Sequence, residues 1–382
     1  MRAEQVFTVA DLFAGAGGLS LGFEIAGFKV VVAAEIDENA KRTYLGNRRG
    51  VEMLGDVREV SGEELLNHTY KLDMIIGGPP CALFSRANAR KYKRYSNHPH
   101  FKLVWEFARV VEEAKPRVFV LENVPQLGHG LGAEVVKSMV ERLKHAGYNS
   151  FWSKILNAAD FGVPQERRRF FLVGAKDLPV GGLSRILGKY KKGPVTVREA
   201  IGDLPPIPEG DRGEDVRDYG EPCLPEFREK LSPYQRAMRR GARKLYNHVC
   251  SKHSEEVVRK IARIKPGSSL RDEWPNLSPE ERRSYIKTSP EKLHSNIYRR
   301  LEWDKPAFTI THARKAMILH PQQNRIISVR EAARLQSFPD AYRFYGGITS
   351  QYQQVADAVP PLLAKALAVA LLKIMKKKAG QR

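Results

Sequence analysis

Residues 74–81 read MIIGGPPC, an apolar run followed by two glycines, two prolines and a cysteine. Because the run from Asp73 to Ile76 is short, apolar and rich in branched side chains, it predicts a buried parallel strand. The prolines restrict the backbone, so we expect Cys81 just past the carboxyl end of this strand, the edge where open α/β sheets bind ligands. A thiol on a stiff turn at that edge is a candidate nucleophile. The alternative is a cysteine that only packs against its neighbours.

A strand, a glycine turn and a helix stand at the beginning of the chain. Val6–Phe13 predicts the strand, AGAGG at 14–18 the turn, and Leu19–Ala26 a helix that Gly27 ends. Glycines let the backbone approach a ligand closely, and the helix N-terminus favours an anionic group. This arrangement predicts a nucleotide-binding βα unit. NAD is the weaker interpretation, because Ser20 stands where the dehydrogenase fingerprint has its third glycine.

Two acidic residues follow the next predicted strands. Glu35 comes directly after the strand Val30–Ala34, and Asp56 follows Gly55 where a third strand is expected to end. A carboxylate after the second strand suits a ribose diol, and one after the third could bind an adenine amino group. Each alone is more often a helix cap or a solvated turn. Both in series after a glycine turn favour a cofactor that contains adenosine.

Further polar residues are expected at the same sheet edge. The predicted strand Arg117–Leu121 delivers Glu122, a candidate general acid whose alternative is a capping role. The run 165–169 (QERRR) enters an apolar strand directly, which favours fixed partners for its arginines over a solvated surface run. The basic loop 82–100 beside Cys81 is either disordered surface or a lid that becomes ordered on a phosphate backbone.

Composition limits the protein class. The 382 residues contain 64 Lys and Arg against 43 Asp and Glu, a net charge of +21 that favours a polyanionic partner over a generic basic surface. Three scattered cysteines predict neither a disulfide framework nor a zinc site, and they suit a reducing, cytoplasmic location. The start of the chain predicts no signal peptide, and we expect no apolar stretch long enough to span a membrane.

The pattern changes at about Leu178, where turn-rich, weakly periodic sequence predicts a second, less regular module. Within it, five cations recur at helical spacing and predict a basic helix face, with even odds between a solvated face and a phosphate-binding stripe: Arg236, Arg239, Arg240, Arg243 and Lys244. Residues 326–338 predict a strand and a helix capped by Ser328. The apolar stripe of the last helix is expected to pack on the first domain.

Taken together, these segments resemble the DNA cytosine-5 methyltransferases. The resemblance lies in six motifs in the family's order: DLFAGAGG (11–18), GGPPCALFS (77–85), LENV (121–124), QERRRFFLVG (165–174), RLEWDKPAFTIT with SVREAARLQSFPD (300–340), and QVADAVPP (354–361). It covers nearly all of the chain except about residues 178–294. It implies a Rossmann-like catalytic domain over 1–177, completed by the C-terminal helix 351–382. A smaller, irregular target-recognition domain would span 178–350.

The resemblance also implies roles for individual residues. Cys81 would be the nucleophile that adds to cytosine C6, Glu122 the acid on the ring, and Arg169, supported by Arg167, the group that holds O2. The residues implied to bind S-adenosylmethionine are Phe13, Ala14, Gly15, Ala16, Gly17, Gly18, Glu35, Ile36, Asp56, Val57, Pro80, Asp357 and Val359. The residues expected to contact DNA are Ser85, Arg86, Arg90, Gln165, Arg236, Arg239, Arg240 and Arg243. No metal is expected.

Two positions depart from the family pattern. The family usually has Gln after the nucleophilic Cys, where this chain has Ala82, and Asn where it has Asp357. Neither change removes a reacting atom. The sequence therefore predicts a monomeric enzyme that methylates C5 of a flipped-out cytosine in a specific duplex DNA sequence, with a cognate restriction endonuclease as a functional partner. The alternatives are a tRNA-methylating member of the family and a degenerate member that only binds DNA.

Overall fold

The computed structural model describes residues 6–69, 71–80, 99–285 and 297–379. Its contacts divide the chain into two units. The first unit contains residues 1–162, 168–193 and 359–382, and the second contains residues 163–167 and 194–358.

Seven strands of the described residues form the central sheet of the first unit, in the order β3-β2-β1-β4-β5-β7-β6. Neighbours from β3 to β5 are parallel, whereas β7 runs antiparallel to both β5 and β6. The predicted α/β, Rossmann-like class is confirmed, but the antiparallel insertion of β7 was not foreseen. The strands are β1 Thr8–Leu12, β2 Lys29–Ala34, β3 Glu52–Leu54, β4 Met74–Gly77, β5 Val118–Asn123, β6 Ser150–Asn157 and β7 Arg168–Ala175.

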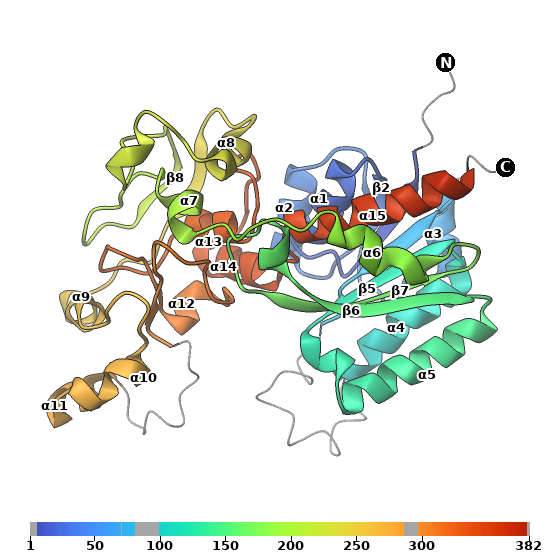
Figure 1. Cartoon of the computed structure of the whole chain (residues 1–382), viewed down its shortest axis with the longest axis horizontal. Coiled ribbons are helices and arrows are strands. Elements are labelled where there is room, and N and C mark those ends of the chain that lie inside the picture. The colour runs from blue at the N-terminus through green and yellow to red at the C-terminus, as the bar shows by residue number, and fades with distance from the viewer. Residues whose placement is uncertain (1–5, 70, 81–98, 286–296, 380–382) are drawn as a thin grey trace. The chain divides into compact units, whose positions relative to one another are not determined.

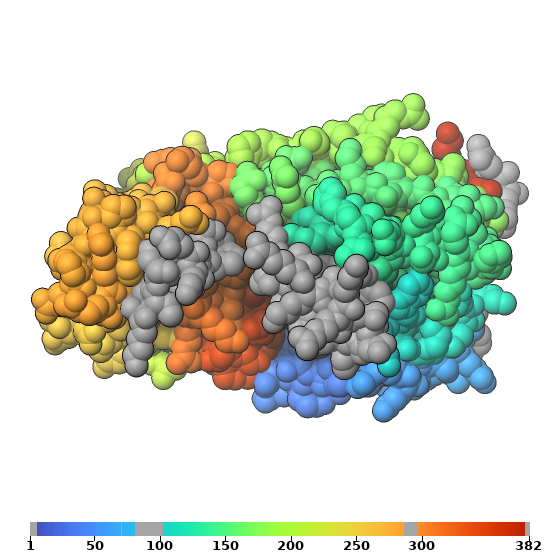
Figure 2. All heavy atoms as spheres, turned by 90° about the horizontal axis from the view of Figure 1, so that it is seen from below, coloured from blue at the N-terminus to red at the C-terminus, as the bar shows by residue number. Residues whose placement is uncertain are grey.

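Helices cover both faces of this sheet (Figure 1): α4 and α5 lie on one side, and α1 and α15 on the other. Atoms of α4 and α5, teal and green, lie together on the face seen in Figure 2. Phe107 of α4 and Phe119 of β5 are fully buried, with their ring centres 6.2 Å apart. The helices are α1 Gly18–Ile25, α2 Glu38–Gly46, α3 Gly62–Asn67, α4 Pro99–Ala114, α5 Leu131–His145, α6 Leu183–Gly188 and α15 Pro361–Ala379.

The last helix, α15, packs on the first unit as predicted. Its residues Leu363, Leu367 and Leu371 are buried, and it lies directly against α1. The approach is so close that a Cβ at Gly22 of α1 would collide with Ala364 and the backbone of α15. This helix therefore closes the sheet face that the first helix leaves open.

The strand order creates a switch point between β1 and β4, where the chain turns to the other half of the sheet. Ligands bind at such a point, outside the carboxyl ends of the strands. The glycine turn after β1, the Gly-Pro turn after β4 and the end of β5 share this edge, because the three strands are parallel. Since β7 is antiparallel to β5, its first residues lie at the same edge.

The second unit contains short elements, as the sequence predicts for this region. Ser328 caps α13: its hydroxyl accepts from Glu331 N at 3.0 Å, and the Glu331 carboxylate accepts from Ser328 N at 2.6 Å. The strands are β8 Gly213–Arg217, β9 Leu245–Val249, β10 Arg299–Arg300 and β11 Ile318–Leu319. The helices are α7 Val197–Ile201, α8 Pro233–Arg239, α9 Glu255–Ala262, α10 Leu270–Glu273, α11 Pro279–Tyr285, α12 Ala313–Ala316, α13 Val329–Leu335 and α14 Ile348–Asp357.

Two sequence-based predictions need correction. The five cations do not share one helix face, because α8 ends at Arg239 and Arg240 has the extended angles φ −57° and ψ 121°. The expectation that no stretch could span a membrane is also wrong on length and composition, since Ile348–Lys378 is long and apolar enough. However, 67% of its apolar window is buried in the protein, as in the core helix of a soluble fold.

Candidate active site at the carboxyl edge of the sheet

Glu122 and Arg169 form an ion pair at this edge. Arg169 Nε lies 3.0 Å from Glu122 Oε1, and both side chains are largely buried, at 14% and 10% exposed. The pairing follows from the antiparallel register, which places Glu122 of β5 opposite Phe171 of β7. A Cβ at Gly78 would lie 2.9 Å from Glu122 Oε2, so the turn after β4 comes close to the carboxylate here.

The neighbouring Asn123 fixes the turn that leads to Cys81. Its Nδ2 donates to Pro79 O at 3.0 Å, and its Oδ1 accepts from Val124 N at 2.8 Å. Asn123 is 2% exposed, so these bonds are shielded from water. The turn after β4 is thereby held beside the Glu122–Arg169 pair. Cys81 itself lies outside the described residues, as do Ala82 and the predicted lid up to residue 98; the last two lid residues, 99 and 100, begin α4.

The glycine turn after β1 leaves space at Gly15 and is tied to β2. Gly15 N donates to Glu35 Oε2 at 2.7 Å, while Glu35 Oε1 accepts from Ile36 N and Asp37 N at 2.9 and 2.8 Å. Phe13 (φ 61°) and Gly17 (φ 82°) give the turn its shape. A Cβ at Gly15 would meet nothing within 4 Å, so space is left for a ligand at the turn.

The other predicted cofactor residues of this unit lie along the same edge. Ile36 is 65% exposed, although large apolar side chains are usually buried, so its surface is free to cover a flat ring. Asp56 follows β3 and pairs with Arg58, and this hydrogen bond lowers the pKa of the carboxyl. Val57 is buried and Pro80 is exposed. An anchored carboxylate, an open glycine turn and an exposed apolar side chain fit an adenosine-containing group.

Three more of the predicted residues lie in or next to the second unit: Asp357, Val359 and Gln165. Asp357 is exposed and accepts from Gln353 Nε2 at 2.8 Å, while Val359 is buried in the first unit. Gln165 is fully buried: its Oε1 accepts from Ile310 N at 2.8 Å and its Nε2 donates to Gln336 Oε1 at 2.9 Å. This geometry favours an internal role for Gln165 over the expected DNA contact.

Arg167 is 1% exposed and donates to three backbone carbonyls of the second unit. Nη1 bonds Ile310 O at 3.0 Å, and Nη2 bonds Ala356 O and Ala358 O at 2.5 and 3.2 Å. The structure therefore shows Arg167 as a buried brace between separate segments. The sequence predicts fixed partners for the arginines of this run, and for Arg167 these partners are backbone carbonyls.

Replacing Arg167 by methionine is expected to destabilise the protein by about 2–4 kcal/mol, because each buried carbonyl left without a donor costs about 1–3 kcal/mol. Urea unfolding measures the difference. The matched control is Arg168→Met, since Arg168 is exposed and its loss should change stability by less than about 0.5 kcal/mol. Equal stability of Arg167→Met and wild type would contradict the bracing role.

The expected DNA-contacting residues differ in exposure. Ser85, Arg86 and Arg90 lie outside the described residues. Arg236, Arg240 and Arg243 are exposed, whereas Arg239 pairs with the buried Asp203 at 2.7 Å and lies 4.1 Å from the centre of the Tyr219 ring. Three of the four arginines around α8 thus remain accessible to a phosphate backbone, and the fourth holds the fold.

A buried polar cluster next to the glycine turn was not predicted from the sequence. Asp11 of β1 accepts from Ser20 Oγ at 2.5 Å, and Ser20 Oγ lies 2.7 Å from Tyr44 OH. Arg48 lies 4.1 Å from the centre of the Tyr44 ring. Two signals were available: a lone carboxylate inside an apolar strand, and the spacing of four between Tyr44 and Arg48.

Burial raises the pKa of Asp11 to about 7, although the Ser20 hydrogen bond and Arg48 act in the opposite direction. In the unfolded chain this carboxyl titrates near 3.9. The folded state therefore keeps a proton that the unfolded state loses. The stabilisation from this proton is complete below pH 4, and it is lost as the pH rises toward 7.

We expect Asp11→Asn to remove this pH dependence. Asparagine has nearly the same shape but does not titrate, so the stability of the variant relative to wild type should rise by a few kcal/mol between pH 4 and 7, at about 1.4 kcal/mol per pKa unit. Urea unfolding of both proteins at pH 5 and pH 8 measures the difference. A relative stability that stays constant across this range would contradict the pKa shift.

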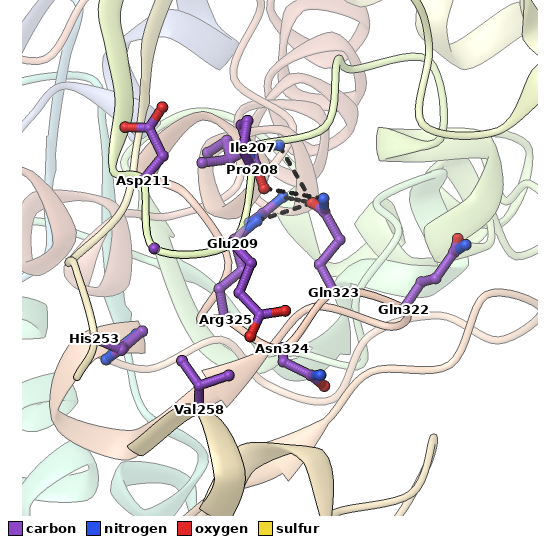
Figure 3. Close-up of a pocket in the computed structure, with 11 residues that line it drawn as sticks. Ile207, Pro208, Glu209, Asp211, His253, Val258, Gln322, Gln323, Asn324 and Arg325 are labelled. Atoms are coloured by element: carbon purple, nitrogen blue, oxygen red, sulfur yellow. Dashed lines mark hydrogen bonds between the residues drawn. The ribbon is translucent and has the colours of Figure 1, made fainter. Parts of the chain in front are cut away.

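The second unit contains a pocket of about 160 Å³ between the turn 207–211, the start of α9 and residues 322–325 (Figure 3). Gln323 closes one wall: its Nε2 donates to Ile207 O at 3.0 Å, and its Oε1 accepts from Arg325 Nη2 at 2.6 Å. None of the residues predicted from the sequence lines this pocket. Within the described residues, no group of three or more His, Cys, Asp or Glu side chains could hold a metal.

The doubly wound sheet, with a glycine turn after β1 and Glu35 after β2, defines a Rossmann-like α/β fold of the kind that binds nucleotides. Comparison with known proteins identifies the family. The chain belongs to the C-5 cytosine-specific DNA methylase family, whose model matches residues 7–373, and it is a DNA cytosine-5 methyltransferase.

Individual relatives agree with this assignment. The chain is 38% identical over 379 residues to type II methyltransferase M.DdeI of Desulfomicrobium norvegicum, covering 94% of this chain and 87% of the relative. It is 36% identical to M1.HphI of Haemophilus parahaemolyticus, covering 96% and 87%. A solved structure of a candidate DNA modification methyltransferase from an E. coli prophage has the same fold, with a TM-score of 0.75, 24% identity and coverage of 97% and 99%.

Proposed function

We propose that this enzyme transfers a methyl group from S-adenosylmethionine to C5 of a cytosine turned out of a specific duplex DNA sequence, through a covalent bond between Cys81 and C6. The observation that carries the proposal is the Glu122–Arg169 pair, held against Gly78 of the turn that leads to Cys81. An acid and a guanidinium therefore lie together at the turn from which the sequence continues to Cys81, and this supports the proposal.

Cytosine C5 is too electron-poor to accept a methyl group unaided. Addition of the Cys81 thiolate to C6 converts the ring to an enamine, whose C5 can attack an electrophilic methyl group. Negative charge then develops at N3 and at O2, the exocyclic oxygen on the neighbouring ring atom C2. Glu122, as an acid, can serve N3, and Arg169 can serve O2 as a fixed donor. Loss of the C5 proton and elimination of the thiol complete the reaction.

S-adenosylmethionine supplies the methyl group on a sulfonium centre. We propose that Glu35 holds the ribose, Ile36 covers the adenine, and Asp56 binds the adenine amino group after releasing Arg58. The open glycine turn and the anchored Glu35 carboxylate support this placement. The other proposed contacts are Phe13, Ala14, Gly15, Ala16, Gly17, Gly18, Val57, Pro80, Asp357 and Val359.

DNA binding is proposed to involve both parts of the chain, with residues 1–177 and 351–382 as the catalytic domain and 178–350 as the recognition domain. Turning a base out of the duplex costs a few kcal/mol, which contacts to phosphates must offset. The exposed Arg236, Arg240 and Arg243 suit this task, as do Ser85, Arg86 and Arg90 by sequence. The net charge of +21 supports the same partner.

The biological setting is also a proposal. Relatives are named type II methyltransferases, so we infer that this enzyme acts as a monomer in the cytoplasm of a prokaryote and protects DNA from a cognate restriction endonuclease. The two thiols of the described residues, Cys223 and Cys250, are free, which fits a reducing compartment.

The test is to incubate the purified protein and labelled S-adenosylmethionine with genomic DNA in one reaction and with tRNA in another. We expect label in duplex DNA, and sequencing of the product should find 5-methylcytosine in one sequence context. Label in tRNA alone would establish the tRNA-methylating alternative instead. No transfer to either substrate, together with retained DNA binding, would indicate a degenerate DNA-binding member.

A further inference from the structure

A chain of three buried polar side chains joins β1, α1 and α2 of the first unit. Asp11, at 1% exposed, ends the chain on β1, Ser20 lies in the first turn of α1, and Tyr44 lies on α2. The hydroxyl of Ser20 is 2.5 Å from Asp11 Oδ2 and 2.7 Å from Tyr44 OH. No catalytic step proposed above uses these three groups.

The direction of the hydrogen bonds follows from the number of protons. Each hydroxyl has one proton to donate. When Asp11 is ionised it can only accept, so Ser20 donates to Asp11 and Tyr44 donates to Ser20. Removing either hydroxyl therefore breaks the path from α2 to β1. Asp11 Oδ1 has no hydrogen-bond partner within the described part of the chain. The hydrogen bond from Ser20 to Oδ2 is therefore the one that holds the carboxylate.

The glycine turn lies between the first two members of this series, since residues 12–19 connect Asp11 to Ser20 in sequence. Arg48, just after α2, holds the far end of the turn: its Nη2 donates to Gly17 O at 2.7 Å, and its Nε donates to Glu24. A Cβ at Gly17 would collide with the Arg48 guanidinium. The Arg48 guanidinium also stacks on the Tyr44 ring, so the two contacts from α2 act together.

We propose that Ser20, Tyr44 and Arg48 are positioning residues that hold the turn 13–18 in the form that binds the cofactor, by linking it to Asp11 and to α2. The inference rests on the proposed function, because that function takes this turn as the cofactor site. The inference gives α2 a direct influence on the affinity for the cofactor. The pairwise bonds also predict that Ser20 and Tyr44 act as one unit.

The test uses Ser20→Ala, Tyr44→Phe and the double variant. Phenylalanine keeps the ring beneath Arg48 and removes only the hydroxyl. We expect each single variant to bind S-adenosylhomocysteine about 5- to 10-fold more weakly in calorimetry without DNA, as for the loss of one buried hydrogen bond. The double variant should lose no more affinity than the single variant that binds more weakly, because both hydroxyls belong to the same series of hydrogen bonds. The KM for S-adenosylmethionine should rise by the same factor, with kcat at saturation unchanged.

Tyr148→Phe is the matched control. Tyr148 is also a buried tyrosine of the first unit, and its hydroxyl donates to Pro116 O at 2.9 Å, away from the glycine turn. The Tyr148→Phe variant should bind S-adenosylhomocysteine as tightly as wild type. Equal weakening by Tyr148→Phe, or additive losses in the Ser20 and Tyr44 variants, would overturn the proposal.

Amide hydrogen exchange in the free protein separates this inference from the proposed function. Exchange of residues 13–18 should be about 5- to 10-fold faster in Ser20→Ala and Tyr44→Phe than in Tyr148→Phe. If wild type binds neither cofactor probe but exchange changes as expected, the cofactor assignment fails and the bracing of the turn stands. Unchanged exchange together with unchanged binding would refute the bracing.

Discussion

Replacement of Cys81 by serine is expected to abolish methyl transfer, lowering the rate by roughly 10⁴-fold or more, as is typical for removal of a covalent nucleophile. A free thiol has a pKa of about 8.5, so a few per cent is already thiolate near neutrality, and a basic site increases that fraction. A serine hydroxyl has almost no anionic form at this pH. Transfer of labelled methyl groups to duplex DNA in a single turnover measures the loss.

A covalent adduct provides a second measurement of the same prediction. DNA that contains 5-fluorocytosine cannot lose a proton from C5, so the thioether should persist, and mass spectrometry should locate it on Cys81. Cys223→Ser is the matched control, because Cys223 lies in the second unit and burial raises the pKa of its thiol to about 11. This control should retain activity and form the adduct. An active Cys81→Ser variant would refute the covalent mechanism.

The strands at the ligand-binding edge could be predicted because their sequences carry the signal themselves. Ile75, Ile76 and Val120 lie in short apolar runs that end in glycine or polar residues, and the structure confirms β4 and β5 there. The antiparallel direction of β7 could not be predicted in this way. An apolar run such as FFLV at 170–173 fits a buried strand of either direction, and only its pairing with β5 decides between them.

The wrong prediction that five cations share one helix face at α8 can be explained from the sequence. Helical spacing of Arg236 to Lys244 indicated a continuous helix, but Gly241 interrupts the run and has φ 79°. A glycine in the left-handed region is a common end of a helix, so the sequence contained the stop. The basic residues beyond it precede β9, and Lys244 pairs with Asp218 at 2.8 Å.

In the candidate site, too, some contacts could be predicted from the sequence and others could not. Glu122 and Arg169 were predicted at one edge from the strands that carry them, and the structure brings them into contact. The partners of Gln165 and Arg167 depend on backbone carbonyls and amides of residues 310–358, far away in sequence. No local pattern encodes such contacts. The Asp11–Ser20–Tyr44 chain was hidden for the same reason, because its three members come from three elements.

Glu122→Gln is expected to lower the rate of methyl transfer by about 10²- to 10⁴-fold, the usual contribution of a positioned acid. Glutamine keeps the size of the side chain and can still hydrogen-bond, but it cannot deliver a proton to N3. Binding of DNA and of S-adenosylhomocysteine should change little, so the loss should appear in kcat. Arg169→Met should produce a comparable loss, because it removes both the donor for O2 and the ion pair with Glu122.

The two groups are predicted to act on one developing charge, so their effects should not add. The double variant Glu122→Gln/Arg169→Met should be less impaired than the product of the two single losses. The control is Glu112→Gln, which alters a similar ion pair with Arg142 on the helices α4 and α5 of the same unit. This pair is away from the sheet edge, and its loss should leave transfer near the wild-type rate. If Glu112→Gln impaired transfer as strongly as Glu122→Gln, the effect at Glu122 would be one of stability, and the acid would have to be sought elsewhere at the edge.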